Sequence, residues 1–375
     1  MRLRPALSLI VLVPGLALAS DLDEPLPVRE SLPFNLLFLD QAPGGADIQP
    51  ASQARFSLSS VYENTMVATT DLILLYERVG QQLYGGRVDL DVLQMVANAQ
   101  PSRTAFILDG ETLRTTLRAR VGIRPRVEIA VEAPFLSQGR GFMDPIIESF
   151  HEHFHMPDGG RDGFANNQFR AGYIGYGETV FLDKAPSGIR LGDVVLSATG
   201  ALLVERPRSP ALSLTLSAKL PSGNYRTLDG SGSVDYGATL RVSRRWGRST
   251  AHAGYAYNVI GEWRLAPAVP LRNSRSFFAA YAFSATPNVS IIGQVLRTVG
   301  PFPFRSGSDL GKVAMETTVG FRRRLPRGFE LEWSFIENIE PYYNTPDIGA
   351  FLGVNYQTGA PRPAASAPGK HPPNR

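Results

Sequence analysis

The chain has 375 residues, of which 43% are hydrophobic and 19% are charged, and its formal net charge is +4. About 25% charged residues is usual for a soluble protein, so this charge is sparse. Its small excess of positive charge gives no reason to expect nucleic-acid binding. The sequence contains no cysteine, which excludes a disulfide, a thiolate nucleophile and a cysteine-ligated zinc site.

Residues 1–19 have the pattern of a signal peptide. The basic start "MRLR" precedes a short apolar stretch, "PALSLIVLVPGLALA", and its final "ALA" predicts cleavage before Ser20. A membrane anchor is the alternative, but this stretch is short and contains a proline and a glycine. No later stretch reaches the roughly 20 apolar residues that a membrane-spanning helix needs. We therefore expect an exported chain.

Residues 20–50 are rich in proline and contain one apolar stretch, "LPFNLLFL". We expect an extended segment that lies in the periplasm or folds into a barrel as a plug. Residues 51–357 then have the pattern of a barrel. The tail from 358 to 375 is rich in proline and alanine, which predicts disorder.

Apolar and polar residues alternate in many stretches between residues 51 and 357. In "TLRTTLRARVGIRPRVEIAVEAP" (residues 112–134), arginines and glutamates recur at alternate positions, which predicts strands with one apolar and one polar face. Short turns alternate with long loops, as at the two ends of an outer-membrane barrel. We predict an all-β fold, a transmembrane antiparallel up-and-down β-barrel of about 12 strands. A periplasmic or secreted β-sandwich, which would show the same period, is the alternative.

The polar phase of these strands predicts a charged lumen. The charged side chains in this lumen could line a polar or anion-guiding path for a small solute. Alternatively, they could pair with one another and fill a closed, structural barrel. The predicted lumen residues are Arg114, Arg118, Arg120, Arg126, Glu128, Glu132, Arg241, Glu316, Arg322, Glu330 and Glu332.

The loop at residues 136–168 contains "MDPIIESFHEHFHMPDGGRDGFANNQF", which predicts a short amphipathic helix near residues 145–156. This helix would fold into the barrel mouth or lie at the lipopolysaccharide interface. It contains the H-E-x-x-H pattern, in which His151 and His155 could bind zinc with Glu152 as a base. Adventitious metal binding, or simply a polar exposed helix face, would explain the same residues.

A lipid hydrolase built on a barrel would need a serine beside a histidine on the lipid side of the rim. His252 lies within a predicted strand, but its phase points it inward. We therefore predict no enzyme activity and no cofactor, and keep the hydrolase as an alternative.

"SFHEHFHMPDGGRDGFANNQF" resembles the F-H-x-x-F-x-x-P-x-G-G-R-x-x-x-x-x-N-x-F block of a family of Gram-negative outer-membrane barrels, domain of unknown function 3187. The matching motif positions are His151, Pro157, Gly159, Gly160 and Arg161. "LPVRESLPFNLLFL", "KLPSGNYRTLDGSGSVDYG" and "NTPDIGAFLGVNY" resemble that family's opening, middle and closing blocks, so the likeness covers nearly the whole mature chain. The resemblance implies an outer-membrane barrel and gives no substrate.

The sequence therefore predicts a protein of the Gram-negative outer membrane, either a channel for a small solute or a surface protein. A barrel lipid hydrolase and a closed structural barrel are the alternatives. The expected partners are outer-membrane lipid, lipopolysaccharide and the barrel-assembly machinery, with no nucleic acid. The oligomeric state does not follow from the sequence.

Overall fold

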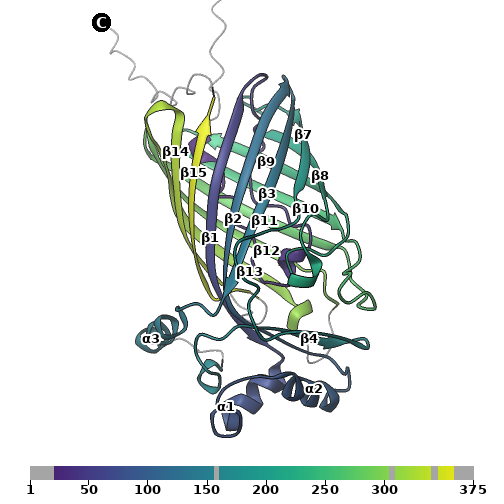
Figure 1. The fold of residues 1–375 in the computed structure, drawn as a ribbon. Coiled ribbons are helices and arrows are strands. Elements are labelled where there is room, and N and C mark those ends of the chain that lie inside the picture. The colour runs from purple at the N-terminus through teal and green to yellow at the C-terminus, as the bar shows by residue number, and fades with distance from the viewer. Residues whose placement is uncertain (1–20, 156–159, 304–308, 339–344, 359–375) are drawn as a thin grey trace, which may run out of the picture.

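The computed structural model describes residues 21–155, 160–303, 309–338 and 345–358. Within these ranges, twelve antiparallel strands close into a barrel, because β1 pairs with both β2 and β15 (Figure 1). The predicted fold and strand number are confirmed. The barrel strands are β1 (Ala54–Ala68), β2 (Ala105–Arg124), β3 (Val127–Gly139), β7 (Val195–Leu203), β8 (Ala211–Lys219), β9 (Asp235–Trp246), β10 (Ser249–Val259), β11 (Ser274–Thr286), β12 (Val289–Val299), β13 (Val313–Arg324), β14 (Phe329–Asn338) and β15 (Ile348–Gln357).

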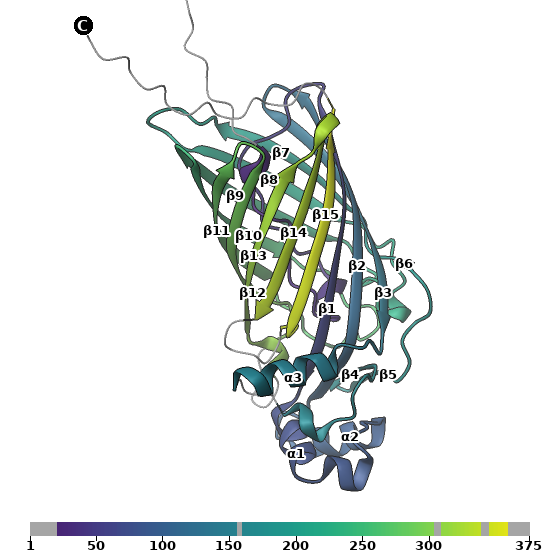
Figure 2. The ribbon, with the colours of Figure 1, turned by 90° about the vertical axis from the view of Figure 1, so that its left-hand side faces the viewer.

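The two ends of the barrel differ. At one end, which we call the short-turn end, β1 begins, β15 finishes and brief turns join β2 to β3, β9 to β10, β11 to β12 and β13 to β14. The opposite, long-loop end carries the longer connections, the helices and the short strands β4 (Arg170–Gly175), β5 (Glu178–Leu182) and β6 (Arg190–Leu191) (Figures 1 and 2).

A small α/β unit extends the barrel at the long-loop end. Residues 105–109 of β2 run past the barrel wall and pair with β4, which pairs with β5. The helices α1 (Thr70–Tyr84) and α2 (Leu90–Ala99) cover this extension and bury Leu72, Tyr76 and Leu93 against it. These two helices were not predicted from the sequence.

The third helix, α3 (Asp144–Phe154), lies where the loop helix was predicted. None of the helices in the described ranges is long and apolar enough to cross a membrane. Single 3₁₀ turns complete the elements: η1 (Asp21–Asp23), η2 (Asn35–Leu37), η3 (Arg161–Gly163), η4 (Tyr225–Thr227), η5 (Asp309–Gly311) and η6 (Pro326–Gly328).

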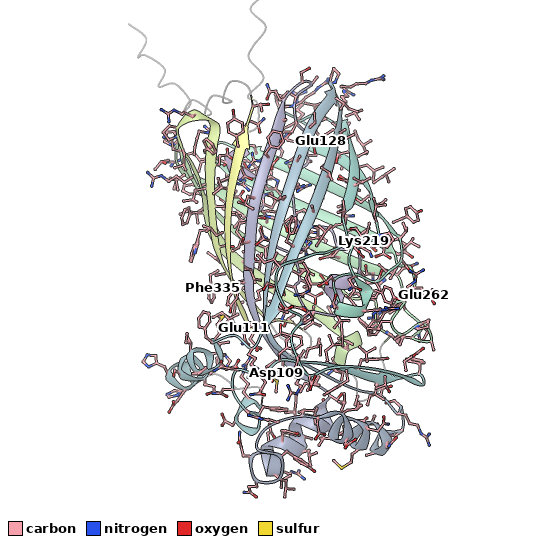
Figure 3. The ribbon with its side chains drawn as sticks, viewed as in Figure 1. Asp109, Glu111, Glu128, Lys219, Glu262 and Phe335 are labelled. Atoms are coloured by element: carbon pink, nitrogen blue, oxygen red, sulfur yellow. The ribbon has the colours of Figure 1, made fainter. Side chains whose placement is uncertain are left out.

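The barrel strands place apolar side chains outward and polar side chains inward. On β14, Trp333 is 43% exposed on the outer face, whereas its neighbour Glu332 is 2% exposed inside. Phe335, labelled in Figure 3, points outward from the same face of β14 as Trp333. Because successive side chains of a strand point to opposite faces, this alternation suits a wall between lipid and a polar interior.

Candidate functional site in the barrel lumen

Residues 21–50 lie inside the barrel, and we call this segment the plug (Figures 1 and 2). Near its start, Asp23 Oδ1 accepts a hydrogen bond of 2.8 Å from Ser290 Oγ, beside the β11–β12 turn. Near its end, the Gln49 N–H donates to Glu128 Oε2 over 2.8 Å, beside the β2–β3 turn. The middle of the plug reaches the long-loop end. The plug therefore enters and leaves the lumen at the short-turn end.

The plug has little secondary structure because its prolines lack a backbone donor and break regular hydrogen bonding. Polar side chains of the wall bind its backbone instead. Leu26 N–H donates to Gln294 Oε1 over 2.9 Å, and Gln294 Nε2 donates to Leu26 O over 3.0 Å. Leu39 N–H donates to Asp235 Oδ2 over 2.8 Å. The wall thus satisfies backbone groups that would otherwise be buried without partners.

Most charged side chains predicted for the lumen form ion pairs there. Arg118 lies opposite Glu132 in the β2–β3 register, with 4.0 Å between Arg118 Nε and Glu132 Oε2. Arg322 lies opposite Glu332 in the β13–β14 register, with 2.5 Å between Arg322 Nη2 and Glu332 Oε1. The other pairs that include predicted residues are Arg114–Glu132 (3.4 Å), Arg120–Glu128 (3.0 Å) and Arg55–Glu330 (2.6 Å).

Arg126 does not lie in the lumen, so its predicted position was wrong. It lies exposed in the turn between β2 and β3, because β3 begins only at Val127. The strand alternation therefore does not extend through the turn to this residue. Arg241 does point inward, from β9, and is 7% exposed.

Glu316 faces inward from β13 in an acidic part of the lumen. Both of its carboxylate oxygens are buried without a hydrogen-bond partner in the described structure. The carboxylates of Glu63 on β1 and Glu30 on the plug lie near enough to repel it. Arg55 and Glu63 were not among the predicted lumen residues. Both lie at inward positions of β1, and the polar residues Ser57 and Ser59 occupy inward positions between them.

Aromatic side chains close the long-loop end around the tip of the plug. The Phe34 ring lies 5.4 Å from that of Trp263, 5.9 Å from that of Phe302 and 6.4 Å from that of Tyr173, measured between centroids. Leu228 joins the same buried cluster from the loop between β8 and β9. The cluster thus joins the plug to three loops and to β4, and it seals this end with apolar contacts.

Arg161, from the predicted loop motif, fastens the long loops together. Its guanidinium donates to Asp144 Oδ1 at the start of α3 over 2.9 Å, and to Asn64 Oδ1 of β1 over 2.6 Å. It also pairs with Asp347, before β15. Gly160 precedes it with a φ of +83°, a conformation that favours glycine. Arg161 thus joins two of the sequence blocks that resemble the family, "SFHEHFHMPDGGRDGFANNQF" and "NTPDIGAFLGVNY".

The other members of the loop motif show no metal site. His151 lies on α3, but His155 follows the end of the helix with a φ of +54°, so the two do not share one helix face. Among the described residues, no group of three or more histidine, aspartate and glutamate side chains could hold a metal ion. Pro157 and Gly159 lie outside the described residues.

His252 forms a serine–histidine pair inside the barrel. Its Nδ1 lies 2.7 Å from Ser243 Oγ, and its Nε2 lies 2.7 Å from the Asp23 backbone oxygen. The Ala46 N–H also donates to Ser243 Oγ over 2.8 Å. The plug therefore covers both side chains, on the opposite side of the wall from lipid.

A large hollow of the described structure lies outside the barrel. It has a volume of about 590 Å³ and follows the outer face of β2, β3, β7, β8 and β9, where Ala119, Ala198 and Ala218 leave space between larger apolar residues. The cavity between plug and wall is much smaller, about 40 Å³, but its lining is charged. The outer hollow suits lipid chains, so we place the candidate site in the lumen.

A closed barrel with an apolar outer face and a polar lumen defines a transmembrane barrel of the outer-membrane type. The chain belongs to the family described as a protein of unknown function, DUF3187, whose model matches residues 48–358. No curated protein sequence matches the chain.

Among solved structures, the chain is similar to the COG4313 outer membrane channel from Pseudomonas putida F1. The sequence identity is 12% and the TM-score 0.52, over 85% of this chain and 100% of that chain. It is also similar to the NanC porin, with 8% identity and a TM-score of 0.40 over 65% and 93% of the two chains. LpxR from Salmonella typhimurium is similar as well, with 7% identity and a TM-score of 0.34 over 81% of this chain and 99% of that chain. At these identities the likeness shows the fold, and the two lower TM-scores carry no further argument.

Proposed function

We propose that this protein is an outer-membrane channel for a small solute and that the plug holds it closed in the state described. One observation carries the proposal: a separate segment, with both ends at the short-turn end, fills the lumen. Such a segment can withdraw as a loop without being threaded through the wall. A lumen filled only by wall side chains would have no comparable route to an open state.

The proposed location is the outer membrane of a Gram-negative bacterium. Short turns face the periplasm in bacterial barrels, so the plug would withdraw toward the periplasm and the α/β unit would face outward. The predicted signal peptide fits export through the periplasm. Contacts with lipopolysaccharide and the barrel-assembly machinery remain part of this proposal.

Withdrawal of the plug would open both ends of the lumen. Phe34 at the plug tip contacts Trp263, Phe302 and Tyr173, so its departure would leave a gap in the aromatic cluster. At the short-turn end, Glu24 would leave Arg120. The same movement would therefore remove the obstruction at the mouth and expose the charged wall.

The alternatives receive less support. The ion pairs of the wall suit a closed structural barrel, but they do not explain why thirty residues of a separate segment are folded into its interior (residues 21–50). A lipid hydrolase would need lipid to reach Ser243 and His252, which lie inside beneath the plug. We therefore propose a channel without enzyme activity.

The test is a reversible lock on the plug in the full chain. A Cβ on Gly300 would lie 3.4 Å from Asn35 Cγ, the position that the sulfur of Asn35→Cys would take, so cysteines at these two positions are close enough to be bridged. Because the chain has no cysteine, Asn35→Cys with Gly300→Cys can form a single disulfide. In planar bilayers, we expect discrete openings of the wild-type chain, none in the oxidised double variant, and their return after reduction.

The single variants Asn35→Cys and Gly300→Cys are the controls, and both should open as the wild type does. If the folded wild-type chain stays silent at every voltage, the channel proposal fails. Openings that persist in the fully oxidised double variant would show that the plug is not the gate.

A further inference from the structure

We propose that the arginines around Arg241 form a binding site for the carboxylate of a small organic anion, and that Glu24 of the plug occupies this site in the closed state. This inference rests on the proposed channel and names the class of its solute. The site lies in the half of the lumen nearest the short-turn end, where plug and wall enclose a cavity of about 40 Å³.

Positive charge on the wall of this cavity exceeds negative charge. The arginines that line it are Arg55, Arg118, Arg120, Arg241 and Arg322. Four of them have a wall glutamate within 4.0 Å, in the pairs Arg55–Glu330, Arg118–Glu132, Arg120–Glu128 and Arg322–Glu332. Glu132 also pairs with Arg114, so none of these four glutamates is left over for Arg241.

Arg241 is the arginine left over. It is 7% exposed, yet no carboxylate of the described structure lies within ion-pair distance of it. Its Nη1 donates to Thr215 Oγ1 over 2.7 Å, its Nη2 donates to the plug's Ala42 O over 3.4 Å, and its Nε has no partner among the described residues. A buried guanidinium without a counter-charge is costly, which favours binding of an anion beside it.

The plug brings a carboxylate into this surplus of arginine. Glu24 Oε2 lies 3.1 Å from Arg120 Nη1, and the charges of Arg55 and Arg322 also act on Glu24. The backbone at and just after Glu24 is held by the wall, because Arg322 Nη1 donates to Glu24 O over 2.8 Å and Arg322 Nη2 donates to Pro25 O over 3.3 Å. Glu24 thus lies where a carboxylate of a solute would be attracted once the plug has left.

The chemistry of the site favours a carboxylate with one negative charge. Guanidinium groups bind carboxylates through charge-assisted hydrogen bonds, and rings of arginine line anion-conducting pores. Because the wall pairs leave the charge of Arg241 unmatched, a single carboxylate balances it. A solute of this class would compete with Glu24, so it would favour the open state while it occupies the site.

The experiment measures the open probability of the full chain in planar bilayers. Sodium acetate replaces sodium chloride at constant ionic strength, and acetamide serves as the uncharged probe of the same shape. We expect acetate to raise the open probability along a saturating curve and acetamide to have no effect. Arg241→Gln should weaken the apparent acetate affinity about tenfold, since it removes a charged hydrogen-bond donor.

Arg126→Gln is the matched control, because Arg126 lies in the β2–β3 turn outside the lumen. It should retain the acetate response. Glu24→Gln provides a second test that leaves the wall intact: it should open without acetate and lose most of the acetate dependence.

The outcomes separate this inference from the proposed channel. Openings that occur equally in acetate, chloride and acetamide overturn the carboxylate site and leave the channel proposal standing. An unchanged acetate response in Arg241→Gln overturns the site in the same way. A folded chain that is silent in every condition, including Glu24→Gln, overturns the channel and the carboxylate site together.

Discussion

Gln294 should determine how often the plug leaves the lumen. Its side-chain amide forms two hydrogen bonds with the backbone of Leu26, at 2.9 and 3.0 Å, and both groups are buried. Each hydrogen bond stabilises by roughly 1 kcal/mol, so Gln294→Ala should favour withdrawal by about 2 kcal/mol. Since 1.4 kcal/mol is a factor of ten, the withdrawn population should rise about 30-fold.

Thiol labelling measures this population without assuming that the barrel conducts. Ala42 is 6% exposed on the plug, and the chain has no cysteine, so Ala42→Cys introduces one protected thiol. A maleimide should react with this thiol only while the plug is withdrawn, and the rate then follows the open population. We expect labelling about 30-fold faster in Ala42→Cys with Gln294→Ala than in Ala42→Cys alone.

Gln82→Ala is the matched control, because Gln82 is exposed on α1 and makes the same change of side chain far from the plug. It should leave the labelling rate unchanged. Equal rates with and without Gln294→Ala would refute the reasoning, because the plug would then not depend on this contact.

Three further changes test other parts of the molecule. Arg161→Met should lower the free energy of unfolding by about 3 kcal/mol, because it leaves the buried Asp144 and the half-buried Asp347 near each other without a positive charge between them. Arg78→Met, at an exposed position, should not lower it. Urea unfolding and proteolysis of the long loops measure both effects. Asp109, labelled in Figure 3, lies in the part of β2 beyond the barrel. Burial raises the pKa of Asp109 from 3.8 to about 7; the charge of Asp144 adds to this shift and that of Arg161 opposes it. Between these two pH values the folded state binds a proton at Asp109 that the unfolded chain has released. The contribution of Asp109 to the free energy of unfolding should therefore be present below pH 4 and lost as pH rises to about 7. Asp109→Asn should abolish this pH dependence. Trp333→Arg, on the outer face of the wall, should lower the free energy of unfolding from lipid by about 2–4 kcal/mol. Trp246→Arg, near the turn between β9 and β10, should lower it by only about 0–1 kcal/mol. Unfolding from vesicles measures both values.

The barrel wall could be predicted because its signal is local. Each strand carries its own alternation, as in Glu330, Leu331, Glu332 and Trp333, and the register with neighbouring strands preserves it. Helix α1 has a local signal too, since Leu72 and Tyr76 are four residues apart and Gly85 ends the helix in a left-handed conformation. It was not predicted because residues 72–76 form a continuous apolar run, which periodicity alone does not distinguish from a buried strand.

The contacts of the lumen could not be predicted, because they join distant parts of the chain. Leu26 and Gln294 are 268 residues apart, and Arg161 and Asp347 are 186 apart. The alternation predicts that Arg241 points inward, but which wall glutamate each arginine meets depends on the closure of the barrel. The surplus charge at Arg241 becomes visible only when all those pairs are known.

The start and the tip of the plug should move together. Glu24 and Phe34 are ten residues apart, which spans at most about 35 Å of extended chain. A plug that leaves toward the short-turn end must therefore release Glu24 from the arginines and pull Phe34 from the aromatic cluster in one movement. Binding of acetate at the arginines should then be coupled to opening at the opposite mouth.

This coupling predicts that a lock at the plug tip abolishes the effect of acetate at the other end. In the oxidised variant with Asn35→Cys and Gly300→Cys, acetate should not raise the open probability, and reduction should restore the response. An acetate response that survives oxidation would mean that the segment around Glu24 can leave while Phe34 stays. The aromatic mouth would then have to open independently, and the plug would be two gates in series rather than one.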